Sequence, residues 1–139
     1  MLEAFRALAI RVDIGVSYRD YPALLSETKV AHSKYSRSEF ASLHEDLTNS
    51  LSEIVEKYEF AMEVWKVQFS NSRSTPFVLS ATKPGIYSAV RSKYPDVKVD
   101  ALDVGPLKGP VIFIPTVLKA IWSSAEEKLD AVEAQAVSF

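Results

Sequence analysis

The stretch SEFASLHEDLTNSLSEIVEKYEFAMEVWKVQF, residues 38–69, decides the fold, because it contains neither proline nor glycine and is typical of one long helix. Its start fits a capping box formed by Ser36 and Glu39. At 1.5 Å per residue the helix would be roughly 45 Å long. A helix of this length needs partner helices along its side, because isolated helices are marginal in water. The apolar seam that would meet those partners consists of Leu47, Leu51, Ile54, Tyr58, Ala61 and Trp65.

Three further segments show the apolar periodicity of helices, and they predict a mainly α fold. The expected helices cover residues 2–14, 18–35 and 115–136. Gly15 can end the first of them as a left-handed cap, and Pro22 fits the first turn of the second. Because the connections between the first three helices are short, we expect antiparallel neighbours. The predicted architecture is an antiparallel four-helix bundle in a single domain, residues 1–139.

Proline and glycine concentrate in residues 71–114, which we expect to form a small insertion before the last helix. Within it, residues 84–94 have the pattern of a short helix that Pro95 ends. Apolar and charged residues then alternate before residues 105–109, and Val111 and Phe113 after them could face the apolar residues, which is typical of a β-hairpin. Pro110 lacks an N–H group, so we expect the second strand of this hairpin to be an edge strand.

The composition is that of an ordinary globular protein. The 139 residues include 16 Lys or Arg, 18 Asp or Glu and 2 His, the net charge is -2, and 47% of the residues are apolar. This apolar share is too high for a disordered chain, and the lack of cysteine excludes disulfides and thiolate metal sites. No secretory signal is predicted, and no apolar run approaches the roughly 20 residues of a membrane span. We therefore expect a cytoplasmic protein, or a periplasmic or envelope-associated one if a leader has been removed.

The sequence lacks the motifs of the common catalytic and metal sites. Neither His32 nor His44 has the Glu three residues earlier that a di-iron bundle uses. Thr48 stands where a zinc-protease motif beginning at His44 would have its second histidine. A glycine-rich phosphate loop and a G-x-S-x-G motif are also missing. We expect no metal, no cofactor and no catalytic residue, with carboxylates or tyrosines assembled in a pocket as the alternative.

Charge is unevenly distributed along the chain. Residues 39–69 hold seven acidic and two basic residues, whereas residues 73–110 hold six basic and three acidic ones. A basic insertion would suit an anionic partner, although the helix propensity of Glu and the exposure of Lys in loops explain the same pattern. A pI near 5.7 argues against nucleic-acid binding. The candidate interaction surface comprises Lys83, Arg91, Lys93, Lys98 and Lys108.

Two other features of the long helix bear on partners. One broad face carries four carboxylates, Glu53, Glu56, Glu59 and Glu63. We expect a solvated face, and the alternatives are a cation site or a docking surface for a basic partner. Off the seam, Val55, Val64 and Val67 widen the apolar face. We expect these valines to be exposed and to favour self-association, with the alternative that Val64 belongs to the core.

Aromatic residues are placed where the helices and the insertion are expected to meet. They fill the core of a small bundle, or they line a pocket for an apolar or aromatic ligand. The candidate ligand-binding residues are Trp65, Trp122, Tyr94 and Tyr58. Aromatic stripes at helical spacing usually belong to the core, so the pocket is the sharper of the two hypotheses.

Four short motifs carry a resemblance to known proteins. They are Gly15-Val16-Ser17-Tyr18-Arg19-Asp20-Tyr21, Tyr58-x-x-Ala61-x-x-x-Trp65, Arg91-Ser92-Lys93-Tyr94-Pro95 and Ile121-Trp122-x-x-Ala125. In these motifs the chain resembles uncharacterised bacterial helical proteins, many of which are similar to small exported or envelope-associated proteins. The resemblance covers most of the chain and implies a helical bundle and an envelope location. It implies no activity and no catalytic residues.

The leading hypothesis for function is a non-catalytic binding module. Its bundle would serve as a scaffold, and its irregular insertion would present the contact surface to an unknown protein partner or to a second copy. A small-molecule sensor or carrier that uses the aromatic pocket is the alternative from another class. An enzyme without a recognisable motif is the third hypothesis.

Overall fold

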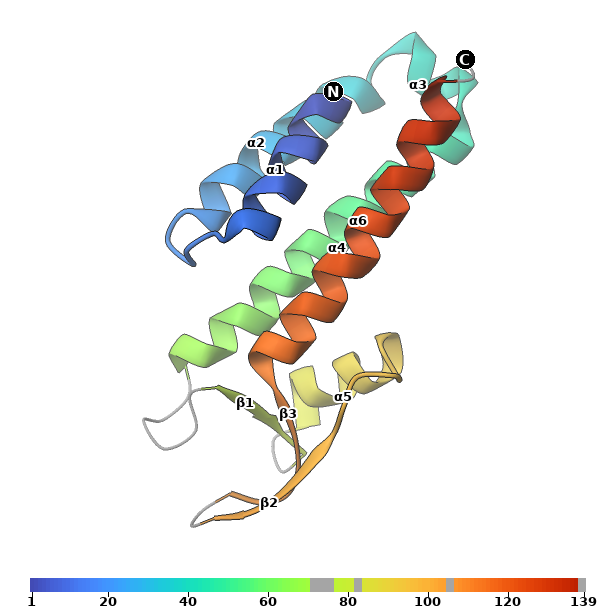
Figure 1. Cartoon of the computed structure of the whole chain (residues 1–139). Helices are drawn as coiled ribbons and strands as arrows, with labels where there is room; N and C mark the ends of the chain where they lie inside the picture. The colour runs from blue at the N-terminus through green and yellow to red at the C-terminus, as the bar shows by residue number, and fades with distance from the viewer. Residues whose placement is uncertain (71–76, 82–83, 105–106, 138–139) are drawn as a thin grey trace. The chain divides into compact units, whose positions relative to one another are not determined.

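The computed structural model describes residues 1–70, 77–81, 84–104 and 107–137, and these residues form a mainly helical protein with a small three-stranded antiparallel sheet (Figure 1). The helices are α1 Leu2–Ile14, α2 Tyr21–Ser36, α3 Glu39–Leu43, α4 Glu45–Ser70, α5 Pro84–Lys93 and α6 Ile114–Val137. The strands are β1 Val78–Ser80, β2 Asp100–Val104 and β3 Leu107–Phe113. The chain divides into two compact units. Unit 1 comprises Met1–Glu59 and Trp122–Phe139, and unit 2 comprises Phe60–Ile121. The expectation of a single domain stays a prediction.

The first two helices follow the sequence pattern closely. Helix α1 has the predicted bounds, and it ends at Gly15, whose φ of 121° lies in a region that side chains disfavour. Helix α2 begins at Tyr21, three residues later than predicted. The cause is a local turn, in which the carbonyl and the hydroxyl of Ser17 both accept from the N–H of Asp20 at 3.1 Å. Pro22 lies in the first turn of α2, as expected.

The prediction of one uninterrupted helix over residues 38–69 is wrong, because the chain leaves helical geometry at His44, where φ is -130° and ψ is 64°. The short helix α3 precedes this break and α4 follows it. The hydroxyl of Thr48 stabilises the break by donating to the carbonyls of Ala41 and His44, each at 3.0 Å. The predicted capping box is also wrong, since the Ser38 hydroxyl caps α3 by accepting from the Ala41 N–H at 3.3 Å.

In unit 1, apolar side chains from α1, α2, α4 and α6 make the core. Polar contacts also join these helices: Lys29 of α2 pairs with Glu59 of α4 at 3.3 Å. Lys57 of α4 donates to the Ser124 hydroxyl of α6 at 3.0 Å. The predicted seam is buried here, at Leu47, Leu51, Ile54 and Tyr58, and it packs in the same unit as Phe5, Leu8, Leu25, Leu129 and Val132.

The prediction that Val55 and Val64 are exposed is wrong. Val55 of unit 1 is 6% exposed and Val64 of unit 2 is 0% exposed, so both belong to the core. The apolar face of α4 is wider than a coiled-coil seam because it is buried on more than one side. These two valines therefore cannot form a surface for self-association.

Unit 2 contains the sheet, whose strand order is β1-β3-β2 (Figure 1). The hairpin of β2 and β3 was predicted, and in the structure Asp100 lies opposite Val111. Strand β1 was not predicted. The expectation that β3 is an edge strand is wrong, since β3 lies in the middle. Pro110 is tolerated there because its nitrogen, which carries no hydrogen, faces β1 rather than β2. Strand β1 ends at Ser80, opposite Val111, so the missing N–H interrupts no bond within that strand pair. The Pro110 carbonyl still accepts from the N–H of Ala81 at 3.1 Å. The described helices include none that is long and apolar enough to cross a membrane.

Candidate functional site

The four predicted pocket residues are divided between the units. Tyr58 and Trp122 belong to unit 1, and Trp65 and Tyr94 belong to unit 2. A ligand pocket lined by all four therefore stays a prediction. Within unit 1, Tyr58 is 1% exposed and Trp122 is half-buried. Within unit 2, Tyr94 is half-buried and its ring stacks on Phe60, with 6.3 Å between ring centroids and 12° between planes.

In unit 1, Tyr21 joins two of these residues into a buried polar cluster. Its hydroxyl donates to the Tyr58 carbonyl at 2.7 Å and accepts from Trp122 Nε1 at 3.3 Å. The rings of Tyr21 and Trp122 also pack together, with centroids 5.9 Å apart. Burial raises the pKa of the Tyr21 hydroxyl, and the Trp122 N–H acts in the opposite direction. Burial likewise raises the pKa of Tyr58, assisted by the charges of Glu126 and Asp13. In unit 1, then, Tyr21 and Tyr58 belong to the core, and the Tyr21 hydroxyl pairs with the half-buried indole N–H of Trp122.

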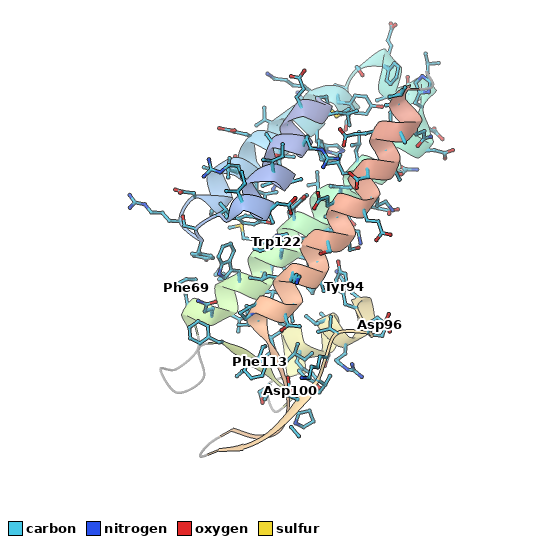
Figure 2. All side chains as sticks on the ribbon, in the orientation of Figure 1. Phe69, Tyr94, Asp96, Asp100, Phe113 and Trp122 are labelled. Carbon is cyan, nitrogen blue, oxygen red and sulfur yellow. The ribbon has the colours of Figure 1, made fainter. Side chains whose placement is uncertain are left out.

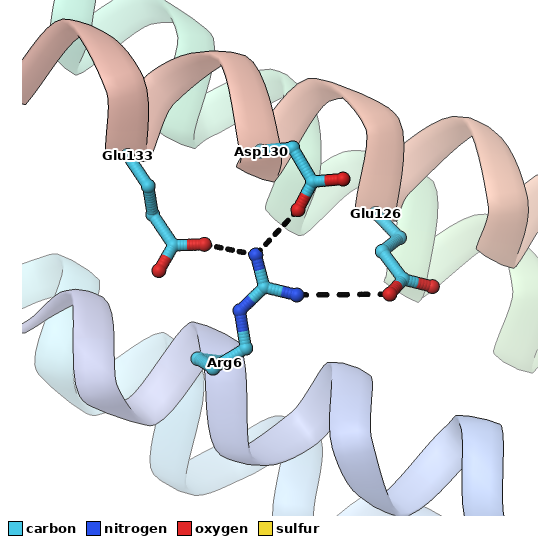
Figure 3. A network of polar contacts seen from close by, with 4 residues as sticks. All are labelled: Arg6, Glu126, Asp130 and Glu133. Carbon is cyan, nitrogen blue, oxygen red and sulfur yellow. Dashed lines mark hydrogen bonds and ion pairs between the residues drawn. The ribbon is translucent and has the colours of Figure 1, made fainter.

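A charged network connects α1 to α6 in unit 1 (Figure 3). Arg6 Nη2 contacts Asp130 Oδ1 at 2.6 Å and also Glu133, while its Nη1 lies 3.6 Å from Glu126 Oε1. The hydrogen bonds to Glu133 and Asp130 raise the pKa of Arg6 further above its usual value. Partial burial raises the pKa of Glu126, and a hydrogen bond with Asp13 adds to this effect. The spacing of four and three residues among these α6 carboxylates was visible in the sequence, but their common partner on α1 was not.

The ring of His32 in unit 1 lies among an aromatic ring and two hydroxyl groups. The His32 ring packs edge-on against Phe5, with centroids 6.3 Å apart, and its Nε2 lies 3.2 Å from the Ser52 hydroxyl and 3.5 Å from that of Ser36. Both hydroxyls donate to helix carbonyls, Ser52 to Thr48 and Ser36 to His32 itself. Burial lowers the pKa of His32. A hydroxyl that donates to a backbone carbonyl leaves its oxygen as the acceptor, so the geometry suits a neutral ring that donates from Nε2.

The described part of the predicted basic surface lies where α5 leads into β2, in unit 2. Lys83 lies outside the described residues, and so does the side chain of Lys108. Arg91, Lys93 and Lys98 are exposed, and we call them the basic corner. They are held in place by neighbours, because Arg91 Nη1 donates to the Pro95 carbonyl at 3.3 Å. The Lys93 ammonium lies 4.3 Å from the centroid of the Phe60 ring, and Lys98 pairs with Asp100 at 3.5 Å.

Exposed apolar side chains lie near Lys98 of the basic corner, at one end of the sheet. Asp100 lies opposite Val111 in the register, so Lys98 and Val99 precede β2 beside the last residues of β3. Phe113 is the final residue of β3, and both Phe113 and Val99 are exposed. Figure 2 shows Asp100 and Phe113 on neighbouring strands of this sheet. This end of the sheet therefore exposes apolar and cationic side chains together.

Unit 1 carries an acidic surface at the break between α3 and α4. A groove of about 470 Å³ lies there, and its lining comprises Ser42, Leu43, His44, Glu45, Asp46, Leu47 and Gln135. Leu43 is 78% exposed, and the ring of Phe40 packs against that of His44 at a tilt of 39°, with centroids 4.2 Å apart. We call Glu39, Glu45 and Asp46 the acidic corner. This groove forms at the break at His44, and the helical pattern of the sequence, which is unbroken there, gives no sign of it.

The carboxylates predicted as one face of the long helix separate in the structure. Lys128 pairs with Glu53 and Lys29 pairs with Glu59 in unit 1, which leaves Glu56 exposed there, while Glu63 is exposed in unit 2. These pairs support the interpretation of a solvated helix face. Among the described residues, no three His, Asp or Glu side chains are grouped to hold a metal ion.

Comparisons with protein-family models, with curated proteins and with solved structures found no match to this chain.

Proposed function

We propose that the protein is a non-catalytic interaction module in which the basic corner of unit 2 binds an acidic protein partner. The observation that carries the proposal is the exposure of three cations, Arg91, Lys93 and Lys98, together with two exposed apolar residues near Lys98, Val99 and Phe113. Apolar contact supplies affinity, and the surrounding charges supply selectivity and steer the partner.

The charge of unit 2 supports an acidic partner. Unit 2 contains 8 basic and 4 acidic residues, a net charge of +4, whereas the whole chain has a net charge of -2. The C-terminal end of α5 favours cations in its last turn, which accounts for Arg91 and Lys93 as local choices. That local stabilisation leaves both side chains exposed, so their charges remain accessible to a partner.

In this proposal unit 1 is a scaffold, built as a four-helix bundle of α1, α2, α6 and the first part of α4. The contacts of Arg6 with α6, of Lys29 with α4 and of Lys57 with α6 support this arrangement. The cluster of Tyr21 adds a hydrogen bond from α2 to α4 and another from α6 to α2. A bundle with its polar groups satisfied internally suits a rigid support for a binding surface.

The test is a titration of a fluorescein-labelled peptide rich in Glu and Leu, followed by fluorescence anisotropy. The variant K93E/K98E should weaken binding by about tenfold, equivalent to about 1.4 kcal/mol. The matched control K66E/K119E changes the net charge equally at exposed positions of unit 2 outside the basic corner, and it should weaken binding by less than about twofold. Equal losses for both variants would show a general effect of charge and would contradict the proposal. Tighter binding of a DNA duplex than of the peptide would also contradict it.

A further inference from the structure

The chain carries opposite net charges on its two units. Unit 1 contains 14 acidic and 8 basic residues, a net charge of -6, and unit 2 has a net charge of +4. We propose that the acidic partner of the basic corner is a second copy of this chain, which presents its acidic corner. This inference rests on the proposed function above, and it names the partner.

The acidic corner has the features that the basic corner requires in a partner. Residues 38–56 contain five acidic residues and no Lys or Arg, and Glu39, Glu45 and Asp46 are exposed among them. Near these carboxylates, Leu43 is 78% exposed and Phe40 is 43% exposed. The groove of about 470 Å³ beside them is large enough to receive a side chain.

The two corners match in composition as well as in charge. The acidic corner has carboxylates near Phe40 and Leu43, and the basic corner has cations near Val99 and Phe113. An apolar centre surrounded by charged residues is the usual anatomy of a protein interface. Contact between the corners of two copies would bury both apolar centres and pair both charged rims.

Helix dipoles explain only part of this arrangement. Glu45 and Asp46 lie in the first turn of α4, where negative charge is stabilised. The dipole does not explain Leu43, which precedes that helix and buries little of its side chain within its own unit. An exposed leucine beside three carboxylates and a groove is better explained by a partner that covers it.

The proposed contact joins two different surfaces, so each copy uses both of its corners. Copies that associate in this way form a closed ring, of which a reciprocal dimer is the smallest, or an open chain. Because the rims are charged and exposed, association should weaken as salt is added.

The experiment is sedimentation velocity on the full chain over a range of concentrations, at low salt and at about 1 M salt, where the Debye length falls to about 3 Å. At low salt the average mass should rise with concentration above that of a single chain. At high salt the association should be at least about tenfold weaker.

Two variants isolate the corners. E39Q/E45Q/D46N removes the charge of the acidic corner while keeping side chains of similar size, and K93E/K98E reverses the basic corner. Each variant alone should remain a monomer, while a mixture of the two should form a 1:1 heterodimer that does not grow, because one intact corner remains on each. The control K66E/K119E should associate like the unchanged chain. Circular dichroism melts confirm that each variant is folded.

A chain that stays monomeric at every concentration, or that associates equally with both corner variants, would overturn the second copy as the partner. Binding of the acidic peptide would then still support the proposed function by itself. If the acidic peptide also fails to bind, the proposed function fails with the inference.

Discussion

The hydroxyl of Tyr21 gives a sharp test of how unit 1 is held together. It is fully buried, donates to the Tyr58 carbonyl at 2.7 Å and accepts from Trp122 Nε1 at 3.3 Å. Tyr21→Phe removes one oxygen atom and both hydrogen bonds while keeping the ring in place. Two neutral hydrogen bonds contribute about 1 kcal/mol each, so the free energy of unfolding should fall by about 2 kcal/mol. For a chain of this length, the loss corresponds to about 6 °C in Tm.

The assay is urea unfolding followed by far-UV circular dichroism. Tyr87→Phe is the matched control, because it removes the same atom from a half-buried tyrosine of unit 2 and should cost less than about 0.5 kcal/mol. A double-mutant cycle with Trp122→Phe should give a coupling of about 1 kcal/mol for the bond between the indole and the hydroxyl. A loss below about 0.5 kcal/mol for Tyr21→Phe, or a coupling near zero, would refute the role given to this hydroxyl.

Three further results are expected. Arg6→Met should lower the free energy of unfolding by about 1 kcal/mol at low salt, and by less at about 1 M salt, because the carboxylates that Arg6 pairs with are partly exposed and are screened by salt. Urea unfolding measures both losses, and an equal loss at the two salt concentrations would contradict the ionic role. Val64→Glu should unfold the protein, since a buried unpaired carboxylate costs several kcal/mol, and a folded variant in circular dichroism would contradict this. Because burial raises the pKa of Tyr21 and Tyr58 above their usual value near 10, the folded state keeps phenol protons that the unfolded chain loses. Stability should therefore be complete below about pH 10 and fall as the pH rises, by up to about 1.4 kcal/mol per pH unit for each tyrosine. The pH series is measured by urea unfolding, and Tyr21→Phe should reduce its slope.

Helix positions were predictable where apolar periodicity and a local stop signal agree. Helix α1 has its predicted bounds because Gly15 provides the stop, and α6 differs from its prediction by one residue at each end. The break at His44 was not predictable in this way. The Thr48 hydroxyl supports it by bonding the carbonyl of Ala41, which precedes the break, and that of His44, which lies at the break. No local rule of composition signals such a contact.

Burial and surfaces were less predictable than helices. In the sequence, Val64 lies outside the predicted apolar seam of the long helix. The buried face of α4 is wider than that seam, so the burial of Val64 is evident only from the packing in the structure. The residues of the basic corner were singled out from the sequence as a candidate surface. The contact of Lys93 with the Phe60 ring and the apolar neighbours of Lys98 were visible only in the structure. The acidic corner could not be predicted, because the groove is produced by the unforeseen break between α3 and α4.

The strand β3 ends at Phe113 and the helix α6 begins at the next residue, Ile114, whose N–H bonds to the Phe77 carbonyl at 2.8 Å. Because no loop separates the two elements, the last residue of the strand fixes the rotation of the helix about its own axis, and so determines which side chains face inward. One inserted residue would rotate the following helix by about 100°. It would turn Val117 and Ile121, both completely buried in unit 2, away from their present surroundings. This junction therefore tolerates no change of length, whereas insertions are accommodated most readily in surface loops.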